Sequence, residues 1–390
     1  MIFEILFWLS FSCLFHSYIL FPLILSLLAK GKILNTQIYN PNDSDLPGVS
    51  ILLAVFNEES VIDEKIKSTF KTIYPFQKIE FIIGSDACSD KTNQIIKQNL
   101  ESFPNIKLIE FENRTGKAAI INYLQTIAKN EVLILTDANV FFEPVTIYNL
   151  VKHYKNQEIA LVGGNIINKN FKNDGISFQE KSYLLRENKI KYQEGIIWGK
   201  MIGSFGGCYS ILKKYYSPVP RNYLMDDFYI TFGVFERNKK AICELDAICY
   251  EDVSNKIQEE FRRKVRISIG NFQNLNRFKK LLFFPLNGLS FSFFSHKILR
   301  WFGPVFIALA FLCSAILWNH NNMYRLFFIS QTVLLLFPLC DFLLKKMNIN
   351  IGSFRFITHF YIMNIALFVG LIKYLNGVNT NVWRPTERNQ

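Results

Sequence analysis

The chain has 390 residues, of which 50% are hydrophobic and 38 are phenylalanine, and its formal net charge is +12. This apolar content exceeds that of an ordinary soluble enzyme, and it is concentrated at the two ends of the chain. The seven cysteines have no spacing typical of a metal site or a disulfide framework, so a small disulfide-stabilised secreted protein is excluded. The basic charge raises the question of nucleic acid, but the sequence has no recognised nucleic-acid module, and we expect no such partner.

Long apolar stretches predict an integral membrane protein. Residues 1–30 can cross about 30 Å of hydrocarbon, and without a basic start or a small-residue cleavage site they are predicted to form a retained anchor. C-terminal transmembrane segments are expected within 298–375. They comprise spans over Ile298–Trp318 and Tyr324–Leu344 and a less apolar stretch over Phe354–Leu375. If that last stretch crosses the membrane, the tail 376–390 lies outside; if it is interfacial or re-entrant, the tail does not.

Basic residues gather where the apolar ends meet the polar middle of the chain. Lys30 and Lys32 follow the first span, and residues 255–297 are dense in arginine and lysine. Because such charges stay cytoplasmic, we expect a multi-pass protein of the cell (inner) membrane whose polar domain faces the cytoplasm. A helix from Asn255 to Lys280 would place Phe261 and Phe272 on one side, which is typical of an interfacial helix that binds anionic membrane lipids.

Residues 46–254 read as one α/β domain. The expected strands are Val49–Phe56, Ile79–Gly84, Ile106–Phe111 and Glu131–Thr136, and the expected helices are Glu58–Lys71, Lys91–Glu101 and Gly116–Ala128. This alternation predicts a doubly wound, mainly parallel sheet. The later half is less regular, with a glycine-rich run at Ile202–Cys208, a helix after Met225 and a strand near Ala241–Tyr250.

Polar side chains follow three of the predicted strands at the point where each strand ends. Asn57 and Glu58 follow the first, Asp86 the second, and Asp137 and Asn139 the fourth. Each pair alone is compatible with a turn or a helix cap. Together they place several hard oxygen ligands at one edge of a parallel sheet, where ligands bind. That arrangement favours a nucleoside diphosphate with a divalent cation.

The order of these motifs resembles the family 2 glycosyltransferases. Five segments carry the resemblance: the opening strand Val49–Val55 with Asn57-Glu58, the segment Asp86-Ala-Cys-Ser-Asp90-Lys-Thr92, the segment Gly116-Lys117-Ala118 with Asn122, the segment Asp137-Ala138-Asn139, and Met225-Asp226-Asp227. The resemblance covers roughly Leu46 to Gly270. It implies an A-type nucleotide-sugar fold with N- and C-terminal transmembrane helices and a hexosyltransferase that uses a nucleoside-diphosphate sugar, with a UDP-sugar as the expected donor.

The resemblance also implies roles for individual residues. Asp137 and Asn139 would bind the divalent metal, Mg²⁺ or Mn²⁺, and Asp227 would be the catalytic base, assisted by Asp226. From its residues alone, the run Gly203-Ser-Phe-Gly206-Gly207 would let backbone approach the acceptor closely, with a plain bulge as the alternative. The nucleotide-sugar would contact Ala54, Asn57, Glu58, Asp86, Lys117, Asp137, Arg263 and Arg266. Two alternatives stay open: Asp226 and Asp227 could simply begin a helix, for which acidic residues are favourable, and Lys117 could be a solvated helix lysine.

One departure bears on the product. Processive members of the family carry Gln-x-x-Arg-Trp after the base, whereas the corresponding stretch here, Gln258–Arg266, has no tryptophan. We therefore expect transfer of one or a few sugars, with inversion, to a lipid-linked or envelope-glycan acceptor. The alternatives are a processive polysaccharide synthase and, from another class, a catalytically silent membrane scaffold.

Overall fold

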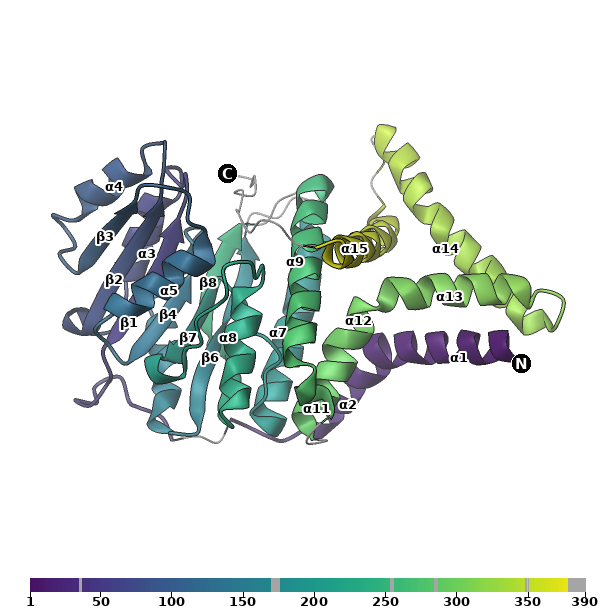
Figure 1. The fold of residues 1–390 in the computed structure, drawn as a ribbon, viewed down its shortest axis with the longest axis horizontal. Coiled ribbons are helices and arrows are strands. Elements are labelled where there is room, and N and C mark those ends of the chain that lie inside the picture. Colours follow the sequence, from purple (N-terminus) through teal and green to yellow (C-terminus); the bar gives the residue numbers. More distant parts are fainter. Residues whose placement is uncertain are drawn as a thin grey trace. The chain divides into compact units, whose positions relative to one another are not determined.

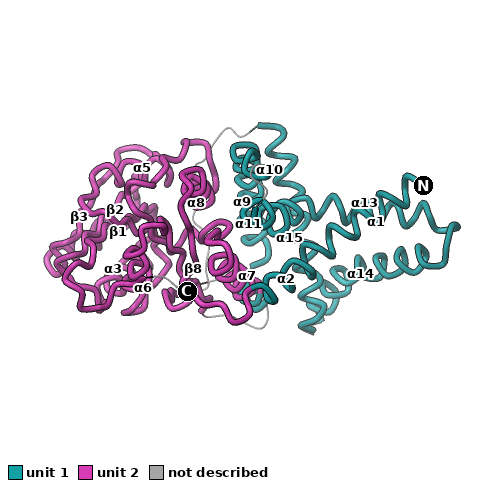
Figure 2. The backbone as a smooth tube through the Cα atoms, turned by 90° about the horizontal axis from the view of Figure 1, so that it is seen from below, with its two compact units in different colours: residues 1–28, 172–182, 254–377 teal, residues 29–171, 183–253, 378–390 magenta. Residues whose placement is uncertain are grey.

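A computed structural model describes most of the chain in two compact units (Figure 2). The described residues are 1–34, 37–169, 176–252, 256–283, 287–347, 349 and 351–377. Unit 1 comprises Met1–Leu28, Lys172–Ser182 and Ser254–Gly377, and unit 2 comprises Ala29–Phe171, Tyr183–Val253 and Val378–Gln390. The predicted tail 376–390 lies outside the described residues after Gly377.

Unit 2 is built on an eight-stranded sheet with the order β3-β2-β1-β4-β7-β6-β8-β5 (Figure 1). The strands are β1 Val49–Val55, β2 Ile79–Asp86, β3 Ile106–Phe111, β4 Val132–Thr136, β5 Val140–Phe142, β6 Ile159–Lys169, β7 Cys208–Leu212 and β8 Lys240–Asp252. Strands β3, β2, β1 and β4 are parallel, as are β6 and β8, whereas β7 is antiparallel to both neighbours. The mainly parallel α/β sheet predicted from the sequence is therefore confirmed.

Six α-helices connect the described strands of unit 2. They are α3 Ile62–Phe70, α4 Thr92–Asn99, α5 Lys117–Ile127, α6 Thr146–Val151, α7 Ser177–Trp198, whose first turns belong to unit 1, and α8 Asp226–Glu236. The helix predicted to begin at Glu58 begins four residues later, at Ile62, because the chain turns before α3. The elements β5, β6, β7, α6 and α7 were not expected.

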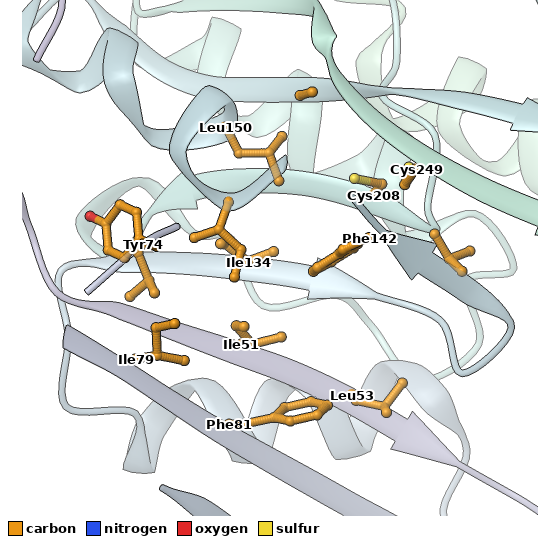
Figure 3. Close-up of a cluster of buried hydrophobic side chains, with 14 of the residues drawn as sticks. Ile51, Leu53, Tyr74, Ile79, Phe81, Ile134, Phe142, Leu150, Cys208 and Cys249 are labelled. Carbon is orange, nitrogen blue, oxygen red and sulfur yellow. The ribbon is translucent and has the colours of Figure 1, made fainter. Parts of the chain in front are cut away.

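Alternation along the parallel strands divides the core into two layers. Ile51, Leu53, Ile79, Phe81 and Ile134 point into one cluster, which α3 and α6 cover (Figure 3). The alternate residue Gly84 faces α5, because a Cβ built there would lie 2.4 Å from Ile120 Cγ2. The strands are thus buried on both faces, which explains their continuous apolar sequences.

Unit 1 is a set of largely apolar helices. They are α1 Ile2–Phe15, η1 His16–Leu20, α2 Phe21–Leu28, α9 Ile257–Phe278, α10 Lys280–Phe283, α11 Gly288–Ser292, η5 Phe293–Ile298, α12 Leu299–Trp301, α13 Gly303–Ile316, α14 Asn322–Lys346 and α15 Gly352–Leu375. Three helices in the described part are long and apolar enough to cross a membrane: Ile2–Leu28, Asn322–Lys346 and Gly352–Leu375. The span predicted over Ile298–Trp318 falls on a pair of helices, Gly288–Trp301 and Gly303–Ile316, that bend by 62° at their junction and form either a broken span or a re-entrant loop.

Helix α9 confirms the predicted helix within Asn255–Lys280, but its apolar side is not free to face lipid. Val265 and Phe272 are buried, and the Phe272 ring lies 5.5 Å from that of Phe302 and 5.9 Å from that of Tyr374. Ser268 Oγ donates a hydrogen bond of 2.7 Å to the Leu367 carbonyl on α15. This side of α9 therefore packs on protein within unit 1.

The close approach of β2 and α5 gives a test of the packing. Gly84→Val should lower the free energy of unfolding by about 1–3 kcal/mol, because the added atoms collide with the buried Ile120 side chain. Thermal unfolding of the solubilised protein measures the effect. Gly352→Ala is the control, since a Cβ at Gly352 meets nothing within 4 Å. Equal melting temperatures for Gly84→Val and wild type would contradict the described contact.

Candidate active site

Lys117 joins two of the predicted acidic positions at the sheet edge. It is the first residue of α5, and its Nζ lies 2.7 Å from Asp137 Oδ1 and 3.8 Å from Asp226 Oδ2. Burial by itself lowers the pKa of Lys117, but the two carboxylates outweigh that effect and raise the pKa above its usual value. Lys117 is therefore a charged lysine paired with carboxylates and not a solvated helix lysine, and its role toward a diphosphate stays a prediction.

Asp227, the expected base, is buried in the first turn of α8. Burial, followed by the neighbouring Asp226 carboxylate, raises its pKa from 3.8 to about 6. Its Oδ1 accepts a hydrogen bond from the Phe228 backbone N–H, which acts in the opposite direction. A carboxylate with a pKa near 6 can accept a proton efficiently at neutral pH. Asp226 and Asp227 begin α8, as the alternative stated, and the role of Asp227 as a base stays a prediction.

The glycine-rich run before β7 lies against both acidic positions. A Cβ at Gly206 would lie 3.2 Å from Asp227 Oδ2, and one at Gly207 would lie 3.7 Å from Asp137 Oδ2. Gly203 has a φ of +78°, which favours glycine. The preceding Phe205 ring has the Lys191 ammonium 3.1 Å from its centroid. Gly206 and Gly207 therefore lie between Asp137 and Asp227, where backbone can approach a reacting group.

The oxygen donors fit a metal that takes few protein ligands. Asp137 is partly exposed, whereas Asn139 is buried and its Nδ2 donates to Glu251 Oε1 at 3.0 Å. Among the described residues there is no group of three His, Cys, Asp or Glu arranged to hold a metal ion. Mg²⁺ bound with a nucleotide needs only one or two carboxylates besides phosphate oxygens. Asp137 can supply one, with the Asn139 oxygen beside it.

Asp86 is buried and already has several protein donors. Its carboxylate accepts hydrogen bonds from Arg114 Nε at 3.1 Å and from the backbone N–H groups of Thr115 and Gly116. The Arg114 guanidinium in turn lies 3.3 Å from the centroid of the Phe56 ring. Arg114, which lies two residues before Gly116 of the Gly116-Lys117 motif, was not predicted from the sequence. Arg114 and Phe56 offer charged and aromatic surface beside Asp86.

Asn57 and Glu58 join the first two strand ends. Asn57, at a φ of +51°, exchanges hydrogen bonds with Ser89, and the Glu58 backbone N–H donates to Thr92 Oγ1 at 2.8 Å. Asn57 is therefore not a cap of α3. Ala54 lies on β1 opposite Gly84 of β2. The first two clusters form one connected polar edge, as predicted.

Arg263 and Arg266 lie on α9 in unit 1, whereas all the other predicted site residues lie in unit 2. Arg263 Nη1 lies 3.2 Å from Glu260 Oε2. That Arg263 and Arg266 contact the diphosphate stays a prediction.

Asn122 has a structural role that the sequence did not reveal. Its amide accepts hydrogen bonds from the Tyr216 hydroxyl and the Val219 backbone N–H, both at 2.9 Å, and donates to the Val219 carbonyl at 2.8 Å. Asn122 therefore attaches the segment before Asp226 to α5, the helix that carries Lys117.

Comparisons with known proteins find similarity to glycosyltransferases over part of this chain. Residues 50–216 match the family model described as Glycosyl transferase family 2. The chain is 30% identical over 129 residues to a probable glycosyltransferase, YdaM, of Bacillus subtilis, covering 32% of this chain and 31% of that protein. It is 23% identical over 238 residues to a poly-beta-1,6-N-acetyl-D-glucosamine synthase of Staphylococcus epidermidis, covering 59% of this chain and 56% of the synthase. The chain thus spans about a third to just over half of these relatives.

A solved structure shares the fold. The mannosyltransferase PcManGT of Pyrobaculum calidifontis, in complex with GDP-Man and Mn²⁺, superposes with a TM-score of 0.73 at 17% identity, covering 96% of this chain and 99% of the other. That similarity shows the fold. Residues 50–216, which carry most of the motifs at the sheet edge, are therefore similar in sequence to the glycosyltransferases of family 2.

Proposed function

We propose that this chain is a membrane-bound hexosyltransferase that moves a sugar from a nucleoside-diphosphate sugar to a lipid-linked or envelope-glycan acceptor, with inversion. The observation that carries the proposal is the meeting of Lys117, Asp137 and Asp227 at one sheet edge. A diphosphate needs positive charge, and an acceptor hydroxyl needs a base. Lys117 supplies the first and Asp227 the second, with Gly206 between Asp227 and the rest of the site.

Each residue then has a chemical task. The acceptor hydroxyl oxygen forms a bond to the anomeric carbon as the bond to the diphosphate breaks, and Asp227 takes the hydroxyl proton. Lys117 stabilises the negative charge that develops on the leaving diphosphate. Asp137, with Asn139 beside it, would hold Mg²⁺ or Mn²⁺, which supplies further charge neutralisation when bound. Asp86, Arg114 and Phe56 would receive the base of the nucleotide.

The nature of the acceptor is supported by named relatives. The chain is 32% identical over 127 residues to a dolichyl N-acetyl-alpha-D-glucosaminyl phosphate glucuronosyltransferase of Methanococcus voltae, and 26% identical over 119 residues to a beta-monoglucosyldiacylglycerol synthase of Trichormus variabilis. Those names describe lipid acceptors, and three helices among the described residues are long and apolar enough to cross a membrane. With the basic residues beside them, these helices favour the cell membrane with unit 2 on the cytoplasmic side.

Release of nucleoside diphosphate tests the function directly. Full-length protein in lipid, supplied with lipid extract as acceptor, should release diphosphate from one nucleotide sugar in a panel of UDP- and GDP-sugars. We expect a UDP-sugar to be the donor. Binding of nucleotide without any turnover across the panel would instead favour the silent scaffold.

Asp227 should set the pH dependence of transfer. Because its pKa is about 6, it is protonated below that pH and cannot accept a proton, so kcat/KM should rise with pH through about 6 and then level. Asp227→Asn should lower kcat roughly 100- to 10,000-fold while donor binding survives. The exposed Asp63→Asn on α3 is the control. Transfer within a few-fold of wild type in Asp227→Asn would refute its role as base.

Removal of the metal should abolish donor binding through Asp137. Chelator on the wild type and Asp137→Ala should both eliminate metal-dependent binding of the donor, measured by calorimetry. Asn139→Asp would place a carboxylate next to that of Glu251, and the two like charges would repel. The melting temperature of this variant should therefore fall without metal and recover when Mn²⁺ is added. Undiminished activity in excess chelator would show that the Asp137–Asn139 assignment is wrong.

Product length separates single transfer from polymerisation. A polymerase must hold its product between additions, and stretch Gln258–Arg266 has no tryptophan to stack on a sugar. Mass spectrometry of products made by the purified chain should therefore show discrete additions of one or a few sugars. A long, heterogeneous polymer would instead support the synthase alternative, which the similarity to the Staphylococcus synthase keeps in view.

A further inference from the structure

Lys65 on α3 is a lysine buried inside unit 2. Its side chain has 0% relative exposure, and burial lowers its pKa to about 7. In the part of the chain that the structure describes, no carboxylate lies within ion-pair distance of its Nζ. Placing an amino group there is unfavourable unless it makes specific hydrogen bonds. The hydrogen bonds of the Lys65 amino group, which an apolar side chain could not make, must therefore account for a lysine at this position.

The hydrogen bonds of Lys65 bracket the turn that carries Asp137. Its Nζ donates to Thr136 Oγ1 at 2.8 Å, at the last residue of β4, and to the carbonyl of Val140, the first residue of β5. Only Asp137, Ala138 and Asn139 lie between these two residues. One amino group thus holds both ends of the turn. The Phe142 ring, which Figure 3 shows in the core beside Cys208 and Cys249, lies with its centroid 3.7 Å from Nζ.

Thr136, which accepts a hydrogen bond from Lys65, also contacts the glycine-rich run before β7. Thr136 Oγ1 donates a hydrogen bond of 2.9 Å to the Gly207 carbonyl. A Cβ at Gly207 would lie 2.8 Å from Val140 Cγ2, so the two segments are in close contact. Lys65 and Thr136 therefore connect the Asp137 turn to the backbone beside Asp227.

We propose that Lys65, acting through Thr136 and Val140, is the positioning residue that fixes the Asp137–Asn139 turn in the geometry that binds a divalent cation with nucleoside diphosphate. The proposal rests on the function proposed above. Lys65 would contact neither the cation nor the nucleotide. It would act through its hydrogen bonds to the two residues that flank the turn. Loss of a residue that supports metal ligands in this way typically weakens metal binding roughly 10- to 100-fold.

A purely structural role predicts a different result. Methionine has nearly the length of lysine and can fill the same buried space without an amino group to desolvate. If Lys65 only filled space, Lys65→Met would keep the turn and the metal affinity. If its two hydrogen bonds hold the turn, Lys65→Met should fold but bind metal weakly.

The test measures Mn²⁺ binding, not turnover. Full-length protein in lipid is titrated with Mn²⁺ in the presence of UDP or GDP, and free Mn²⁺ is followed by electron paramagnetic resonance. Lys65→Met and Thr136→Val should each raise the Kd for Mn²⁺ roughly 10-fold or more. Lys67→Met, two residues along α3 and exposed beside Asp63, should leave the Kd unchanged.

The outcomes separate the two proposals. If wild type binds no Mn²⁺ with either nucleotide, the metal-assisted function itself is wrong. If wild type binds and both variants bind equally well with unchanged circular dichroism, the role of Lys65 is refuted. Should Lys65→Met fail to fold, Thr136→Val decides, because it removes the hydroxyl that receives the Lys65 hydrogen bond while preserving shape.

Discussion

The Lys117 ammonium makes the crowding of carboxylates at the sheet edge possible. Asp137 and Asp226 come from different elements, and without a cation between them their charges would repel in a partly buried site. Lys117 contacts Asp137 at 2.7 Å and lies 3.8 Å from Asp226. Because Asp226 adjoins Asp227, this ion network also fixes the surroundings that raise the pKa of the base. The positions of α5 and α8 are thus linked by the ion pair of Lys117 with Asp226.

The parallel half of the fold could be predicted because its strands are short apolar runs buried on both faces. Glycine and acidic residues mark their ends, so β1 to β4 and the helices between them lie close to the expected ranges. The antiparallel β7 and the long β6 were missed, since pairing across the sheet depends on contacts between residues far apart in sequence. The same reason explains α7, whose buried Glu187, Asn188 and Lys191 give no clear apolar periodicity.

The site was predicted to the level of motifs but not of contacts. Asp137, Lys117 and Asp227 could be proposed from the order of the motifs and the family resemblance that these motifs carry. Arg114 and Lys65 could not, because nothing local to either residue reveals the carboxylate or the turn it meets. A lysine two positions away, Lys67, is exposed beside Asp63, so sequence pattern does not distinguish the buried lysine from the solvated one.

The pairing of Asn139 with Glu251 explains why a neutral residue stands at the end of the Asp137 turn. Glu251 lies near the end of β8, and its Oε1 accepts a hydrogen bond of 3.0 Å from Asn139 Nδ2. An aspartate at 139 would meet that carboxylate as a like charge, whereas asparagine donates to it and keeps an oxygen available. The orientation of this oxygen is then fixed by Glu251 on one side of the turn, while Lys65 holds the turn from below. The turn therefore owes its shape to residues from β8 and α3.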